Sequence, residues 1–308
     1  MNLRKLPYKA YLFFNRSLKF LEKLQVRSPE EMLPSRPVFI LGAPRCGSTL
    51  IYQNLVSTLD LAYLSNLHCF LFGAPWLIER ITNAPDKFRS NPVYNSQLGF
   101  TKGRYAPSEC GEFWYRFFRR MPQYVDSVGT SKKKELRIAL HAFLKASGKP
   151  VLFKNLVSVL RLKPLIETIP EAVFIVIHRE EKDMAHSILE ARKKMTGNYT
   201  SWFSLRPPNI EELLPLSPEK QVVHQIRSTY ELISDAEKQY PDTPFFHIQY
   251  EDFCNSPEKI IVDVKNFLHQ QHVQVRKVSA PQSRFEKRSE IKIDKALYNS
   301  LINYIKKN

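Results

Sequence analysis

Several features that would place this 308-residue chain in a common class of protein are missing. Its four cysteines have no paired spacing, so we expect free thiols in a reducing compartment rather than a disulfide framework. No apolar run is long enough to cross a bilayer, and the basic start of the chain lacks the continuous apolar core of a secretion signal. We therefore expect a cytoplasmic protein and leave open a peripheral contact with a membrane.

Acidic residues are scarce as well, since 30 Asp and Glu stand against 46 Lys and Arg and give a net charge of +16. A basic surface attracts nucleic acids, anionic lipids or anionic small molecules. Because the sequence has no nucleic-acid-binding module, we expect an anionic small molecule and no nucleic acid. Metal ligands are also missing. His269 and His272 have H-x-x-H spacing, but without a third ligand nearby they are typical of a polar helix end.

The most informative stretch that is present reads VFILGAPRCGSTL, residues 38–50. Residues 38–41 form a short apolar run typical of a buried strand, and a helical pattern begins at Leu50. Between them, residues 42–49 have the G-x-x-x-x-G-x-[ST] spacing of a phosphate loop, whose N–H groups and helix start point at an anion. A tight turn without a ligand is the alternative, and the flanking strand and helix patterns disfavour it.

One position of the loop differs from the loop of an ATPase. Ser48 stands where the lysine that grips the terminal phosphates would be, and Arg45 lies inside the loop instead. We therefore expect a phosphate-like group other than the β- and γ-phosphates of ATP. The residues predicted to bind it are Arg45, Cys46, Gly47, Ser48, Thr49 and Leu50. Because Cys46 lies beside Arg45 and several N–H groups, we expect a lowered thiol pKa.

A second phosphate site is predicted further along the chain. The apolar run at residues 173–177 predicts another buried strand, and Arg179 follows its carboxyl end. Asp183 lies at the start of the next predicted helix, and Ser187 lies within that helix. A solvated strand-end arginine is the alternative. Together with the glycine loop, Arg179 and Ser187 favour a ligand with phosphates at two ends of one nucleoside.

The rest of the chain is consistent with one large domain. Hydrophobic residues make up 43% of the sequence, which excludes a disordered chain. Strand-length apolar runs separated by helical stretches predict an α/β fold, a parallel sheet flanked by helices. We predict a basic, aromatic-rich helical segment over residues 1–34 and a single P-loop-like α/β domain over residues 35–308.

The N-terminal segment allows two interpretations. It can pack as a helix on the rest of the protein, which is the favoured one, or lie on a membrane as an amphipathic helix. In the second case its buried side would consist of Tyr11, Phe13, Phe14, Leu18 and Leu21.

These motifs resemble those of sulfotransferases that use 3′-phosphoadenosine 5′-phosphosulfate (PAPS). Residues 44–49, PRCGST, are similar to the family's first motif, commonly PRSGTT, and Arg179 with Ser187 matches its second. Residues 246–253, FHIQYEDF, resemble the family's YEDL segment. The resemblance covers most of the chain and looks closer to the broad bacterial and Golgi-type branch. It implies PAPS as cosubstrate without a metal, and transfer of a sulfuryl group to a hydroxyl, with a carbohydrate or glycolipid as the first expectation.

The resemblance also suggests catalytic residues. Lys154 ends a stretch similar to the strand that carries the family's lysine, and it is our candidate to steady the bridging oxygen. Arg45 would help to hold the 5′-phosphosulfate. Leu156 stands where cytosolic members have a histidine, so the general base must come from elsewhere. Glu109 is the first candidate for this base, and Glu112 and His68 stay open.

Alternatives remain for this region and for the function. Glu109 and Glu112 also suit a capped surface helix, and the nearby aromatic residues either line an acceptor groove or pack in a core; they are Trp114, Tyr115, Phe117 and Phe118. A P-loop kinase would need the missing loop lysine and a carboxylate for Mg²⁺. A non-catalytic protein would bind membranes or polyanions through its N-terminus and a C-terminal cluster of Arg284, Lys287 and Arg288.

Overall fold

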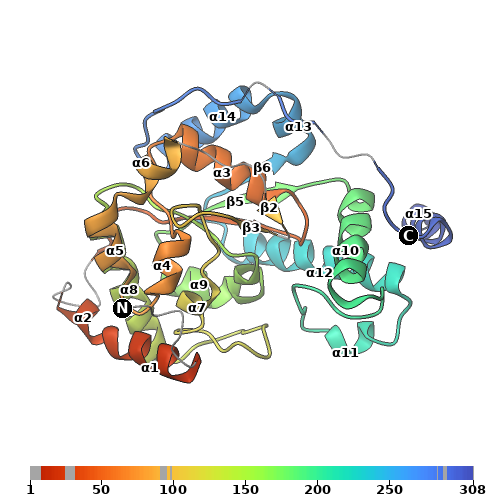
Figure 1. Cartoon of the computed structure of the whole chain (residues 1–308), viewed down its shortest axis with the longest axis horizontal. Helices are drawn as coiled ribbons and strands as arrows, with labels where there is room; N and C mark the ends of the chain where they lie inside the picture. The colour runs from red at the N-terminus through yellow and green to blue at the C-terminus, as the bar shows by residue number, and fades with distance from the viewer. Residues whose placement is uncertain are drawn as a thin grey trace.

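A parallel sheet of four strands forms the centre of the protein, and helices cover both of its faces (Figure 1). This computed structural model describes residues 8–24, 32–90, 96–97, 99–282, 284–286 and 290–307. The strand order is β4–β1–β5–β6, and the strands are β1 (Val38–Gly42), β4 (Leu152–Lys154), β5 (Val173–His178) and β6 (Phe245–Gln249). The predicted α/β fold with a flanked parallel sheet is confirmed, and both predicted strands are present as β1 and β5.

The strands separate two hydrophobic cores, because neighbouring side chains of a strand point to opposite faces. Ile40 and Ile175 contribute to the first core, and Phe39 and Phe174 contribute to the second. The first core is closed by α3 (Ser48–Thr58), α10 (Glu181–Thr196), α13 (Tyr250–Asn255), α14 (Pro257–Gln270) and α15 (Lys295–Lys307). The second is closed by α5 (Pro75–Thr82), α7 (Gly111–Trp114), α8 (Thr130–Ser147), η2 (Leu156–Arg161) and α9 (Leu162–Thr168).

The remaining elements lie around this sandwich. Helix α12 (Pro218–Gln239) contributes to both cores. The others are α1 (Tyr8–Leu18), α2 (Phe20–Lys23), α4 (Asn66–Phe70), α6 (Ala84–Arg89), α11 (Ile210–Leu213) and the antiparallel pair β2 (Ser96–Gln97) and β3 (Phe100–Thr101). Within the described ranges, no helix is both long enough and apolar enough to cross a membrane.

The N-terminal helices pack on the second core, which is the favoured one of the two interpretations. Tyr11, Leu18 and Leu21 contact this core, and the Tyr11 hydroxyl donates a hydrogen bond to the carbonyl oxygen of Cys69 at 3.0 Å. The prediction that Phe13 and Phe14 lie on the same side of the segment as these residues is wrong. Phe13 is 74% exposed, and Phe14 is also exposed. Helix α1 therefore has apolar residues on two sides, and only one side packs against the protein.

The aromatic residues that follow Glu112 belong to the core. Trp114, Phe117 and Phe118 are buried, and the Trp114 ring packs against Phe39 of β1. The acceptor-groove interpretation of this run is therefore wrong for these three rings, since they are buried in the second core and do not line the cavity described below. Of the proposed C-terminal basic cluster, Arg284 is exposed, and its other two members lie outside the described residues.

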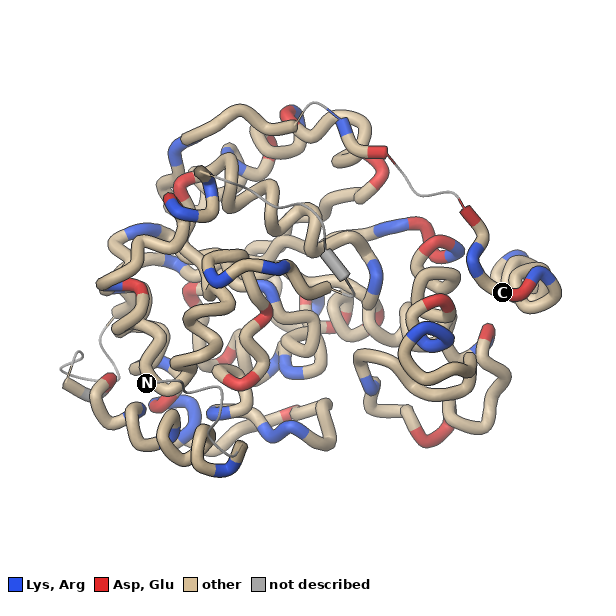
Figure 2. The backbone as a smooth tube through the Cα atoms, in the orientation of Figure 1, with Lys and Arg blue, Asp and Glu red and all other residues tan. Residues whose placement is uncertain are grey.

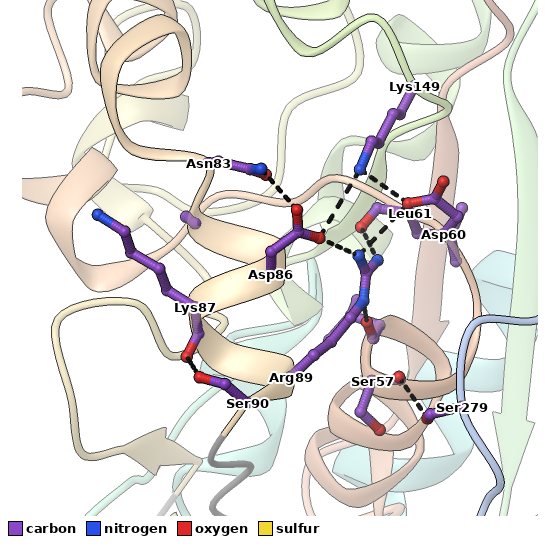
Figure 3. A network of polar contacts seen from close by, with 12 residues as sticks. Ser57, Asp60, Leu61, Asn83, Asp86, Lys87, Arg89, Ser90, Lys149 and Ser279 are labelled. Atoms are coloured by element: carbon purple, nitrogen blue, oxygen red, sulfur yellow. Dashed lines mark hydrogen bonds and ion pairs between the residues drawn. The ribbon is translucent and has the colours of Figure 1, made fainter.

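A network of charges holds the chain that leaves α14 against the end of α3 (Figure 3). The Asp60 carboxylate accepts hydrogen bonds from Arg276 at 2.8 Å and Arg89 at 3.3 Å, and pairs with Lys149 at 2.8 Å. Burial alone would raise the pKa of Asp60, but these cations outweigh it and lower the pKa. Ser279 also donates to the Ser57 carbonyl at 2.8 Å, so residues 276–279 are fixed before the chain reaches the cavity described below.

Candidate active site

The glycine loop joins β1 to α3, in the order that the sequence predicts. Arg45 and Gly47 both adopt left-handed φ angles, 68° and 88°, and Gly47 caps the N-terminus of α3. A side chain at position 47 would collide with the ring of Tyr250, so only glycine fits there. The positive end of the α3 dipole lies at this loop. The N–H group of Leu50, which we predicted to bind the ligand, donates to the Gly47 carbonyl at 3.0 Å.

A cavity of about 790 Å³ lies above this loop, at the carboxyl ends of the strands. One wall is formed by the loop, Arg179 after β5, Ser187 on α10 and Tyr250 at the start of α13. Lys154 at the end of β4 and Glu109 also line the cavity. The predicted site residues that line the cavity are Arg45, Gly47, Ser48, Thr49, Leu50, Glu109, Lys154, Arg179 and Ser187.

The residues of the two predicted phosphate sites line one cavity and contact one another. Arg45 Nε donates a hydrogen bond to Ser187 Oγ at 2.8 Å, and Arg179 Nη1 donates to the carbonyl oxygen of Arg45 at 3.1 Å. The Arg179 guanidinium lies over the Tyr250 ring, 4.7 Å from its centre. Arg179 Nε is buried and has no hydrogen-bond partner among the described residues, so a donor is free for an anion.

Lys154 and Glu109 meet at the mouth of the loop. The Lys154 side chain is buried, and its Nζ forms an ion pair with the Glu109 carboxylate. Nζ also donates to Thr49 Oγ1 at 3.2 Å. Asn155 Nδ2 donates to the Glu109 carbonyl oxygen at 3.1 Å, which fixes the backbone at this point. A cation and a carboxylate therefore stand side by side over the start of α3.

The other two base candidates lie away from the cavity. His68 is completely buried, where Ser65 N donates to its Nδ1 at 2.9 Å and Glu79 pairs with its Nε2 at 3.1 Å. This ring caps the short helix α4. Glu112 forms an ion pair with Arg120 and accepts a hydrogen bond from the Tyr8 hydroxyl. Of the three candidates, the structure brings only Glu109 to the cavity.

Cys46 differs from the prediction. Its side chain is fully buried beneath the loop, and burial raises the pKa of the thiol. Hydrogen bonds from Ser48 and the charges of Lys154 and Arg179 act in the opposite direction but do not outweigh burial. The backbone N–H of Cys46 donates to the Ala43 carbonyl at 3.2 Å, so it is used within the loop. The prediction of a lowered pKa is therefore wrong.

Several cavity residues were not found from the sequence. On α10, Asp183, His186 and Glu190 line the cavity with Ser187, and their three- and four-residue spacing could have indicated one helix face. Further cavity residues come from distant segments without a motif: Phe100, Phe203, Ser204, Leu205, Gln282, Phe285 and Glu286. No local pattern marks these, because their positions depend on how remote segments pack.

A sequence model described as the sulfotransferase family matches residues 37–273. The chain belongs to this family. Curated relatives include the omega-hydroxy-beta-dihydromenaquinone-9 sulfotransferase Stf3 of Mycobacterium tuberculosis and of Mycobacterium bovis, each 25% identical over 258 residues. These alignments cover 75% of this chain and 62% of each relative, so the chain spans less than two thirds of their length.

Solved structures of sulfotransferases have a similar fold. Sulfotransferase STF9 from Mycobacterium avium superimposes with a TM-score of 0.58 at 15% identity, covering 97% of this chain and 83% of its own. STF1 from Mycobacterium tuberculosis gives a TM-score of 0.51 at 16% identity, covering 84% and 74%. The predicted family and fold are thereby confirmed, and the similarity to these structures concerns the fold alone.

Proposed function

We propose that this protein transfers a sulfuryl group from PAPS to a hydroxyl group of an acceptor. The proposal rests on one cavity that is lined by both the glycine loop and the Arg179–Ser187 pair. Arg45 of the loop donates a hydrogen bond to Ser187 and accepts one from Arg179 at its carbonyl oxygen. A nucleoside with phosphates at both ends requires two anion sites at a short, fixed separation. The free Nε of Arg179 and the N-terminus of α3 supply donors for the two ends.

Two groups of residues would hold the donor. PAPS would supply an activated sulfuryl group, held at the loop by Gly47, Ser48, Thr49 and the N–H groups of the α3 N-terminus. Arg179 and Ser187 would hold the 3′-phosphate. Among the described residues, no group of three or more His, Cys, Asp or Glu side chains could hold a metal ion.

Glu109 and Lys154 are our proposed catalytic pair. The Glu109 carboxylate is positioned to accept the proton of the acceptor hydroxyl, since it stands at the loop mouth without occupying the loop. The Lys154 ammonium would stabilise the negative charge that develops on the oxygen bridging sulfur and phosphate. Its bond to Thr49 holds it over the start of α3. An acceptor hydroxyl would enter between the two paired groups and separate them.

Part of the cavity lining is apolar. Leu156 and Val157 follow Lys154 and Asn155 in the sequence, and Phe100, Phe203 and Leu205 come from other segments. A carbohydrate alone would find few polar partners there, whereas a glycolipid could place its hydrocarbon part against these side chains. The curated relatives are named for a menaquinone-derived acceptor, which is also lipid-like. We therefore propose a hydroxylated acceptor with an apolar part, such as a glycolipid.

Thermal melting with nucleotides tests this function against a P-loop kinase. The product 3′-phosphoadenosine 5′-phosphate (PAP) should raise the melting temperature, because a ligand that binds only the folded state stabilises it. ATP with Mg²⁺ should stabilise less, since Ser48 replaces the loop lysine. Transfer of label from PAPS across a panel of glycolipids, sugars and phenols then identifies the acceptor. Stabilisation by ATP–Mg²⁺ without stabilisation by PAP would contradict the proposal.

We also propose a peripheral contact with anionic membranes through the outer side of α1 and α2. Phe13 and Phe20 are exposed there, close in sequence to the exposed cations Lys9 and Arg16. Lys and Arg segments are present on and near these helices in Figure 2. Exposed aromatic and cationic side chains together suit an anionic bilayer surface. Sedimentation with phosphatidylglycerol vesicles tests this contact, and binding unchanged by a combined Phe13→Ser and Phe20→Ser substitution would exclude it.

A further inference from the structure

A strained turn forms part of the cavity wall between α10 and α11. Its central residue, Ser204, has a φ of 71°, in the left-handed region that residues with a side chain rarely adopt. Phe203 and Leu205 flank it, and all three residues line the cavity. Such a conformation persists only where the surrounding structure holds it, and it is common at functional sites. The side chains that hold this turn are therefore informative.

The turn is held from within by one buried amide. Gln225 on α12 is completely buried, and its Nε2 donates to the carbonyl oxygens of Phe203 at 2.8 Å and Leu205 at 2.6 Å. These two carbonyls stand on either side of Ser204, so one amide group fixes both ends of the turn. The Trp202 indole also donates to the Leu205 carbonyl at 2.8 Å.

A second buried side chain supports the approach to this turn. Arg192 on α10 is completely buried and donates to the Tyr199 carbonyl at 3.2 Å and to Gln221 Oε1 at 2.7 Å. Its guanidinium lies 5.1 Å from the centre of the Trp202 ring. Both of these hydrogen bonds come from Nη1, and Nε and Nη2 have no hydrogen-bond partner among the described residues. The backbone before the turn is thus fixed by the helix that also carries Ser187.

The turn contacts the segment that follows Lys154. Leu205 is buried in a small cluster with Leu156 and Leu160, which belong to this segment. Ser204 is exposed, and it lines the cavity together with Leu156. The turn is thereby connected to the proposed catalytic lysine, at the end of the cavity that we assign to the acceptor.

We propose that Gln225 is a positioning residue for acceptor recognition. It holds the 203–205 turn as a preformed wall that selects acceptors with an apolar group next to the reacting hydroxyl. This inference rests on the proposed sulfuryl transfer and adds the origin of acceptor selectivity. Because Gln225 touches the turn and not the phosphate-binding residues, its loss should affect the acceptor and not the nucleotide.

Thr168 provides a control away from the turn. It lies on α9, is also buried, and its Oγ1 donates to the carbonyl oxygen of Pro164 at 2.6 Å. Neither of these residues lines the cavity. Gln225→Met therefore removes buried donors at the cavity wall, and Thr168→Val removes a buried donor elsewhere in the fold.

The experiment measures transfer from PAPS to octyl β-D-glucoside and to methyl β-D-glucoside, which lacks the hydrocarbon chain. The wild-type protein should have the lower KM for the octyl compound. Gln225→Met should raise this KM about tenfold and leave the affinity for PAP unchanged, since a displaced wall weakens only acceptor contacts. Thr168→Val should leave this KM unchanged, whatever its effect on the melting temperature.

Each of the other outcomes would contradict a different part of the proposal. Equal changes in KM for Gln225→Met and Thr168→Val, or no change in Gln225→Met, would exclude the positioning role. Equal KM values for the two glucosides, or transfer to neither despite PAP binding, would exclude the apolar wall. Absence of PAP binding in the wild type would exclude the proposed function itself. Should Gln225→Met not fold, Ser204→Val tests the same turn from the cavity side, because a β-branched residue disfavours this φ angle, and the same KM effect is expected.

Discussion

Removing the side chain of Arg179 should weaken PAP binding more than any other single change at the nucleotide end. The guanidinium is 14% exposed, and one of its donors, Nε, is buried without a partner in the described part of the chain. A hydrogen bond that involves a charged group contributes about 1.5–3 kcal/mol. Arg179→Ala should therefore cost about 2–4 kcal/mol of PAP affinity, or roughly 30- to 700-fold, at 1.4 kcal/mol per factor of ten.

Calorimetry with two nucleotides distinguishes the direct effect from an indirect one. Arg179 also donates to the Arg45 carbonyl, so its removal could disturb the glycine loop. AMP has the 5′-phosphate but lacks the 3′-phosphate, and its affinity should change little in Arg179→Ala. Ser187→Ala, which removes a neutral donor, should lose less PAP affinity, about 0.5–1.5 kcal/mol. Unchanged PAP affinity in Arg179→Ala, or an equal loss for AMP, would refute a 3′-phosphate site at Arg179.

Three further predictions follow from the site and its support. Glu109→Gln should keep PAP affinity but lower kcat by on the order of 100-fold or more. Glu112→Gln should retain most activity in the PAPS assay. Normal turnover of Glu109→Gln would exclude Glu109 as the base. Cys46 should resist alkylation in the native protein with or without PAP, as followed by mass spectrometry, because burial raises its pKa; rapid labelling would show that the loop opens. Asp60 has a lower pKa in the folded than in the unfolded protein, so its contribution to stability should be complete above its ordinary pKa of 3.8 and disappear as the pH falls below it. Chemical denaturation of Asp60→Asn across this pH range checks the last prediction, which requires the variant to lose less stability on acidification than the wild type.

Local sequence patterns were sufficient for two strands of the sheet and for the loop and helix residues beside them that line the cavity. Strands β1 and β5 are buried on both faces, so they appear in the sequence as continuous apolar runs. The glycine at position 47 has a left-handed φ angle. Arg179 and Ser187 lie at a strand end and on the helix that follows. All of these constraints act within a few residues of one another, or repeat at the period of a strand or helix, and therefore leave a pattern in the sequence.

Tertiary structure alone decided the base candidate and the acceptor wall. From the sequence, Glu109, Glu112 and His68 were all candidates for the general base. In the folded protein, His68 is buried against Glu79, and Glu112 forms an ion pair with Arg120. Glu109 meets Lys154 across 45 residues of chain. The same applies to Cys46, whose thiol points into the core, and to Phe13, on the side of α1 that does not pack. Gln225 reaches the 203–205 turn from another helix. Burial, side-chain direction and contacts between distant segments arise only when the cores form, because no local period encodes them.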